Sequence, residues 1–308
     1  MKVRLDATCD VRDGLLRVVD QEVEDVLARL AHPTADRADD VHATRLALKR
    51  LRAIWHLIRP LAVDAVAQEQ NDRLRAAAAL LAPQRDAVIA RESLAALLDE
   101  DILPNQRAAI LTVQDHLATP VKEQAVAGDT ENVLHRVEPV LRQTLAALRG
   151  TGWTSDGWEA LAPGLGRTWA KLRRAYRDAC VRGQEEDFHA WRKMVKRAQF
   201  QLGLVREAWP KRLRPMVKAL RQLGDRLGDA HDLDVLRERL TDPSHPLALP
   251  AMTALVLQVI EAKQLRLRDK CRQIWAEAVD DKPKGFLHRL ERHYRARYGS
   301  PAGRPLAA

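Results

Sequence analysis

The chain of 308 residues has a formal net charge of +9 and a pI near 9.7, with 30% charged and 4% aromatic residues. This composition is typical of a helical protein with an anionic partner, but it does not separate nucleic acid, a phosphate polymer and a membrane surface. The three widely spaced cysteines argue against a zinc ribbon or a secreted disulfide framework and favour the cytoplasm. The chain shows neither a signal peptide nor 18 consecutive uncharged apolar residues, so no membrane partner is expected.

Apolar residues at helical spacing predict six helices in the first half of the chain. They are expected at 12–31, 39–58, 64–82, 86–99, 104–119 and 131–149. Proline residues mark several of the predicted ends, and Pro139 predicts a kink or a break within the sixth helix. The Gly-rich segment 150–166, which also contains a proline, is predicted to be a linker.

The second half repeats this order of elements. Helices are expected at 167–182, 187–207, 213–227, 232–241, 251–279 and 284–298. No alternating run of strand type is found, so the fold class is predicted to be all-α. Four tryptophans lie among apolar neighbours and are predicted core residues: Trp55, Trp169, Trp191 and Trp275.

Two helix-length stretches, 39–58 and 186–205, share the pattern His-x-x-Arg-x-x-x-Lys-Arg. At an offset of 147 positions, His42, Arg45, Lys49 and Arg50 fall on His189, Arg192, Lys196 and Arg197. A second match places Arg85-Asp86 on His231-Asp232, in the same order along the chain. The repeat predicts two pseudo-symmetric helical bundles, 1–150 and 151–308, with a basic groove between them.

The first copy has a strip of cations on one helix face. At about 100° per residue, His42, Arg45, Lys49 and Arg52 fall within an arc of roughly 80°. A positive group then recurs about every 5 Å, which suits a repeating anion better than a single small one. The alternative is a solvated helix face, but the strip recurs with its histidine in the second half.

Further cationic rows lie on helices that flank the second copy. Arg167, Lys171 and Arg174 are spaced i, i+4, i+7, and so are Arg214, Lys218 and Arg221. Gln199 stands where the first copy has Arg52. The first 150 residues carry 20 basic and 23 acidic residues, a net of −3, whereas the rest carry 31 and 19, a net of +12. The second half is therefore expected to supply most of the positive field.

The paired histidines and aspartates each allow two interpretations. His42 and His189 either contact phosphate directly or pack and hydrogen-bond within the groove. Asp86 and Asp232 are expected to act as helix N-caps or to pair with neighbouring basic side chains. A histidine among arginines should have a lowered pKa and gain a proton when an anion binds.

These motifs, in this order and spacing, resemble the CHAD domain family over about residues 12–298. The resemblance implies an all-helical, non-catalytic protein that binds inorganic polyphosphate in the cytoplasm, at polyphosphate granules and with granule-associated proteins as further partners. It implies no cofactor and no metal, and no CYTH triphosphatase domain is expected before the first helix. The candidate binding residues are His42, Arg45, Lys49, Arg52, Arg85, Arg167, Lys171, Arg174, His189, Arg192, Lys196, Arg214, Lys218, Arg221 and His231.

Two other functions stay open. A duplex nucleic-acid binder would also need rows of cations, although the core-like tryptophans weaken any base-stacking role. His189, His231, Asp232 and Asp269 loosely follow the ligand order of a metal-dependent HD-type phosphohydrolase. The chain contains neither a phosphate-binding GxxxxGK[ST] loop nor HExxH.

Overall fold

The computed structural model describes residues 4–5, 10–32, 34, 37–62, 64–81, 83–118, 123–242, 249–279 and 283–299. Within these ranges the protein is all-α, with eleven helices and no strand, which confirms the predicted fold class. The helices are α1 Val11–Ala31, α2 Arg37–Ile58, α3 Asp64–Leu80, α4 Pro83–Leu97, α5 Pro104–Ala118, α6 Glu123–Gly150, α7 Gly157–Arg182, α8 Glu185–Leu204, α9 Pro210–Thr241, α10 Pro250–Ala278 and α11 Pro283–Tyr298.

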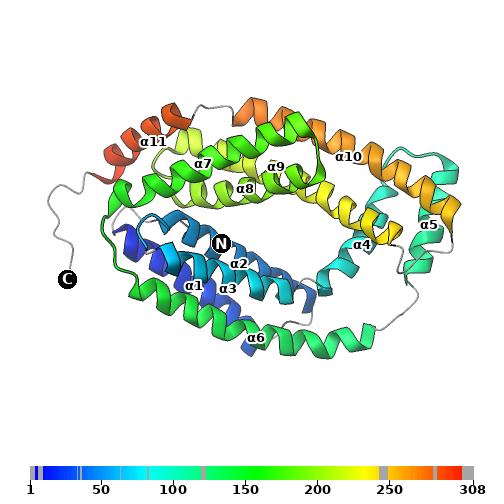
Figure 1. The fold of residues 1–308 in the computed structure, drawn as a ribbon, viewed down its shortest axis with the longest axis horizontal. Coiled ribbons are helices and arrows are strands. Elements are labelled where there is room, and N and C mark those ends of the chain that lie inside the picture. The colour runs from blue at the N-terminus through cyan, green and yellow to red at the C-terminus, as the bar shows by residue number, and fades with distance from the viewer. Residues whose placement is uncertain are drawn as a thin grey trace.

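The helices form two groups that meet along the middle of an elongated molecule (Figure 1). Helices α1, α2, α3 and α6 pack together on one side, and α7, α8 and α9 pack together on the other. Helices α2, α7 and α8 contact one another where the groups meet. At the far end, α4 and α5 pack against α9 and α10.

Two hydrophobic clusters hold this arrangement, and each draws on both halves of the sequence. The larger joins α1, α2, α3 and α6 to α7, α8, the start of α9, and the facing parts of α10 and α11. The smaller joins α4 and α5 to the end of α9 and the start of α10. The division at residue 150 therefore stays a prediction, because the apolar packing crosses it in both clusters.

The four tryptophans predicted to be core residues are buried, none more than 2% exposed. Trp169 stacks on Phe286 with ring centroids 4.3 Å apart, and Trp275 stacks on Tyr176 at 4.4 Å. These rings tie α7 to α10 and α11. The tryptophans serve the core, and none of these four presents a surface on which a base could stack.

The predicted linker at 150–166 is largely wrong, because α7 already begins at Gly157. Pro163 and Gly164 lie inside α7, where the sequence suggested a loop. A Cβ on Gly164 would lie 1.9 Å from the carbonyl oxygen of Leu57. This glycine therefore allows α7 to cross α2 at very short range, and it does not interrupt the helix.

The predicted break between 227 and 232 is also wrong, since α9 runs unbroken through this stretch. His231 and Asp232 consequently lie in a helix interior, and Asp232 is no N-cap. Gly224 and Gly228 give room on α9 for the side chains of Lys196 and Arg192, which approach within 2.9 and 3.6 Å of an added Cβ. Likewise, α6 continues through Pro139 without the break that the sequence allowed.

Candidate polyanion-binding site

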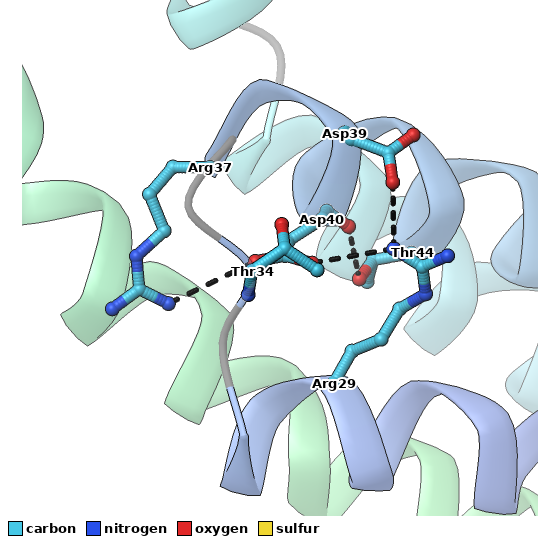
Figure 2. A network of polar contacts seen from close by, with 6 residues as sticks. All are labelled: Arg29, Thr34, Arg37, Asp39, Asp40 and Thr44. Carbon is cyan, nitrogen blue, oxygen red and sulfur yellow. Dashed lines mark hydrogen bonds and ion pairs between the residues drawn. The ribbon is translucent and has the colours of Figure 1, made fainter.

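A polar network holds the first turn of α2 in place (Figure 2). Helix α2 carries the first cationic strip. The buried carboxylate of Asp40 accepts the backbone N–H of Thr34 at 3.0 Å. Arg29, in the last turn of α1, donates to Asp39 at 2.7 Å and to Asp40 at 3.3 Å. Acids in the first turn also suit the positive end of the helix dipole. The network fixes the position of α2 relative to α1.

A similar contact fixes the start of α8. Arg182, the last residue of α7, donates from Nε to Asp187 at 3.0 Å and pairs with the same carboxylate through Nη2. Between them Gly183 adopts a φ of +68°, and its N–H caps α7 on the carbonyl of Ala179 at 3.2 Å. Both His-x-x-Arg helices thus begin with a carboxylate held by an arginine of the preceding helix.

Helices α2 and α8 are held together near their C-terminal ends. The fully buried Gln201 of α8 donates from Nε2 to the backbone carbonyl of Ala53 on α2 at 2.8 Å. The crossing of α7 over Leu57 lies on the same stretch of α2. Basic side chains on these three helices are therefore forced close to one another.

Where these helices converge, and on the adjoining part of α9, the structure gathers cations that we call the basic cluster. It comprises Lys49, Arg52 and His56 of α2, Arg59 directly after α2, Arg167 and Lys171 of α7, His189, Arg192, Lys193 and Arg197 of α8, and His231 of α9. Arg52 links its two ends, because its charge lowers the pKa of Lys193 and of Arg197 in addition to their burial. Cations from both halves of the sequence therefore act on one another.

At one end of the basic cluster lie two histidines, one from each of two helices. The rings of His189 and His231 are 4.4 Å apart and tilted by 43°. Burial lowers the pKa of each to about 4, with further lowering by Arg192 and Lys193. Lys49, from α2, adds to the lowering for His231. Among the described residues, the buried Nδ1 atoms of both rings have no hydrogen-bond partner.

At the other end lies a pocket of about 250 Å³, which we call the His56 pocket. It is lined by His56, Arg59, Arg167, Thr168, Lys171 and Arg197. Burial lowers the pKa of His56 to about 3, and the charges of Arg197, Arg52, Lys171 and Arg59 lower it further. Burial and the charge of Arg52 also lower the pKa of Arg197 to about 10.

Several of the residues predicted to bind the anion also make contacts within the protein. Arg45 donates to the carbonyl of Leu81 at 2.8 Å and so satisfies the end of α3. Lys196 pairs with Asp225 at 2.7 Å, and Arg214 pairs with Glu207 at the same distance. A polyanion would have to compete with these carboxylates.

The remaining predicted residues lie away from the closest packing. Arg174 is highly exposed and lies 3.8 Å from Asp178, while His42, Lys218 and Arg221 are also exposed. Arg85 belongs to α4, but its side chain, like that of Asp86, lies outside the described residues.

Four residues of the basic cluster are not among the binding residues that the sequence predicts: His56, Arg59, Lys193 and Arg197. The sequence contains a signal for two of them, because the strip continues past Arg52 to His56 on α2 and to Arg59 directly after α2, at the same spacing of three or four. Arg197 was matched to Arg50 in the repeat, but nothing in the sequence shows which of the two meets a carboxylate.

The ligand set suggested for a metal-dependent hydrolase does not gather among the described residues. No three histidine, cysteine or acidic side chains in that part of the chain lie close enough to hold a metal ion. Asp269 pairs with Arg272 at 2.6 Å. In the same part of the chain, no helix combines the length and apolar character that crossing a membrane requires.

The protein is all-helical, and cations from several of its helices lie close together, as a site for a polyanion would require. The sequence model of the CHAD domain matches residues 17–241, and the chain therefore belongs to the CHAD domain family. This family is associated with polyphosphate binding and is generally non-catalytic. A search of curated proteins found no match.

Proposed function

We propose that this protein binds inorganic polyphosphate along the basic cluster and catalyses no reaction itself. The observation that carries the proposal is that several helices bring cations together, around the His56 pocket at one end and beside the His189–His231 pair at the other. In agreement with this crowding, the pKa values of Arg52, His56, His189, Lys193, Arg197 and His231 are all lowered. Burial is the largest cause for each, and neighbouring cations add to it. Beside an anion the three histidines would gain their charged form more easily, and the repulsion among the arginines and Lys193 would be offset, so ligand binding relieves the repulsion.

Polyphosphate suits this arrangement because it is a linear anion without bases. Arginine can engage two phosphate oxygens at once, and lysine acts as a compact point charge. Four helices contribute cations, and on α2 these recur about every 5 Å. A repeating anion can therefore meet several of them in succession, with affinity that depends strongly on salt.

The proposed site extends from the His189–His231 pair to the His56 pocket, with Arg52 between them. This extent supports a groove shared by the two halves of the repeat, and we propose the pseudo-symmetric bundles 1–150 and 151–308 as its frame. The cellular setting that we propose is the cytoplasm, at polyphosphate granules, with granule-associated proteins nearby.

The test is a competition titration of the full chain with labelled long-chain polyphosphate. Unlabelled polyphosphate and duplex DNA are added at equal phosphate concentration and fixed salt. We expect polyphosphate to compete at least tenfold more effectively, because the cluster is built for a single narrow anion. Equal competition by DNA would instead favour a general duplex binder and would reject the specific proposal.

A further inference from the structure

The His56 pocket differs from the rest of the basic cluster because it is a partly open recess and not a strip of side chains. Its lining contains five basic side chains and the hydroxyl of Thr168, with no acidic side chain. The volume of about 250 Å³ exceeds the ~150 Å³ of a cavity that accommodates benzene. Helices α2, α7 and α8, which supply the lining, lie side by side (Figure 1). A compact multivalent anion therefore fits by volume and by charge.

The two arginines that end the repeated motif have different surroundings. Arg50, in the first copy, donates from Nη1 to both carboxylate oxygens of Glu22, at 2.8 and 3.0 Å. Glu22 belongs to α1 and is only 3% exposed. The first copy thus carries its own buried counter-ion for this arginine.

Arg197, in the second copy, has no such counter-ion among the residues that the structure describes. In the part of the chain that the structure describes, no carboxylate lies within ion-pair distance of its guanidinium. The buried polar side chain that α7 contributes to the pocket is Thr168, 4% exposed, which carries no charge. A buried charge is stabilised only when it is paired, so an anion from solution would complete this site.

We propose that the His56 pocket binds a compact phosphate anion, which is either free phosphate or pyrophosphate or the terminal phosphate of a polyphosphate chain. Of these, only binding of the terminal phosphate of a polyphosphate chain rests on the proposed function. A terminal phosphate has two ionisable oxygens, whereas a phosphate within the chain has one, so the terminal group better matches five clustered bases. Arg197 can bind it through two N–H groups, and the Thr168 hydroxyl can donate a further hydrogen bond.

His56 couples this binding to a proton. The cations that face it are Arg52 from its own helix, Arg59 directly after that helix, Lys171 from α7 and Arg197 from α8. Burial and, after it, the charge of these cations keep the free imidazole neutral, and a bound anion would offset that charge. The imidazole then takes up a proton as the anion binds and becomes a further donor to it.

The test is calorimetric titration of the full chain with pyrophosphate, in the wild type and three variants. Thr168→Glu places a carboxylate in the pocket lining to which Arg197 also belongs, and Lys171→Glu reverses a charge at an exposed lining position. Arg177→Glu is the matched control, with the same charge change at an exposed position on the same helix, outside the pocket lining. We expect the dissociation constant to rise at least tenfold in both pocket variants and to stay unchanged in the control.

Because Thr168 is buried, Lys171→Glu keeps the test valid if the first variant does not fold. Equal pyrophosphate affinity in the wild type, Lys171→Glu and Arg177→Glu would overturn the proposal, and so would the absence of pyrophosphate binding to the wild type.

A second titration separates the two sources of phosphate. Linear tripolyphosphate has terminal phosphates, whereas cyclic trimetaphosphate has none. We expect at least a tenfold preference for the linear form, which Lys171→Glu removes; equal affinities would overturn recognition of the chain end. If pyrophosphate binds and long polyphosphate does not, the pocket stands and the proposed function fails. If only long polyphosphate binds, the proposed function stands and the pocket inference fails.

Discussion

The affinity for long-chain polyphosphate should rise as the pH falls from 8 to 6. Without ligand, the pKa values of His189 and His231 are lowered to about 4, so both rings are neutral throughout this range. A bound polyanion offsets the charges of Arg192, Lys193 and Lys49 and raises both pKa values. Binding then takes up protons below the raised pKa, which makes it tighter at the lower pH.

The size of this pH effect depends on how far the bound anion raises the pKa values of the two histidines. If the anion restores one histidine to the ordinary pKa of 6.5, the dissociation constant falls about fourfold between pH 8 and pH 6. If the anion restores the ordinary pKa of both histidines, the dissociation constant falls about sixteenfold. If the two rings, 4.4 Å apart, take up only one proton between them, the fall is about fourfold.

Fluorescence anisotropy with labelled polyphosphate, at constant ionic strength, measures this dependence. The double variant His189→Gln, His231→Gln is the comparison, because it keeps polar side chains but cannot titrate. It should bind with a weaker pH dependence than the wild type, because His56 is then the one remaining of the three histidines whose pKa is lowered. A wild-type affinity that is flat between pH 6 and 8 would refute the role assigned to the histidine pair.

Three further predictions concern the basic cluster and the frame that holds it. Replacing both Arg52 and Lys193 by alanine should make the salt dependence weaker: the negative slope of log affinity against log salt should shrink in magnitude by about 1.4, since each phosphate neutralised on a single strand contributes about 0.7. An unchanged slope in salt titrations would place the ligand elsewhere. Gly164→Ala should destabilise the fold by about 3 kcal/mol in urea unfolding, because its Cβ would meet the Leu57 carbonyl at 1.9 Å. Gly203→Ala, with nothing within 4 Å of its Cβ, is the control and should be neutral or stabilising. The three histidines with lowered pKa bind protons more readily in the unfolded protein than in the folded protein. Their contribution to stability is therefore present above pH 6.5 and is lost as the pH falls towards 4. The urea concentration at the unfolding midpoint should fall over that range, and polyphosphate should reverse much of the loss.

Helix positions were largely predictable because prolines and apolar spacing are local features. The start of α7 was not, since Pro163 and Gly164 look like loop residues in isolation. Only the crossing with Leu57 of α2 explains why a glycine is needed at that point. The continuity of α9 was missed for a related reason, because its glycines provide room for long side chains of α8 and do not end the helix.

The sequence predicted which helices carry the candidate cations, but it did not predict the contacts that each cation makes. Helical spacing placed Arg45 on the strip, but it could not show that the end of α3 uses this guanidinium as a hydrogen-bond donor. Nor could it show that Asp225, on another helix, meets Lys196. Arg197 gained its place only through the contrast with Arg50, which depends on a buried glutamate from α1. Such pairings are set by tertiary packing and leave no periodic signal in the sequence.

The most direct measurement is a crystal structure of the full chain with a linear polyphosphate of defined length. Phosphate groups should lie between α2 and α8, within hydrogen-bond distance of Arg52, Lys193 and Arg197. A chain bound instead to the outer face of α11, or to any surface from which these three residues are absent, would contradict the account.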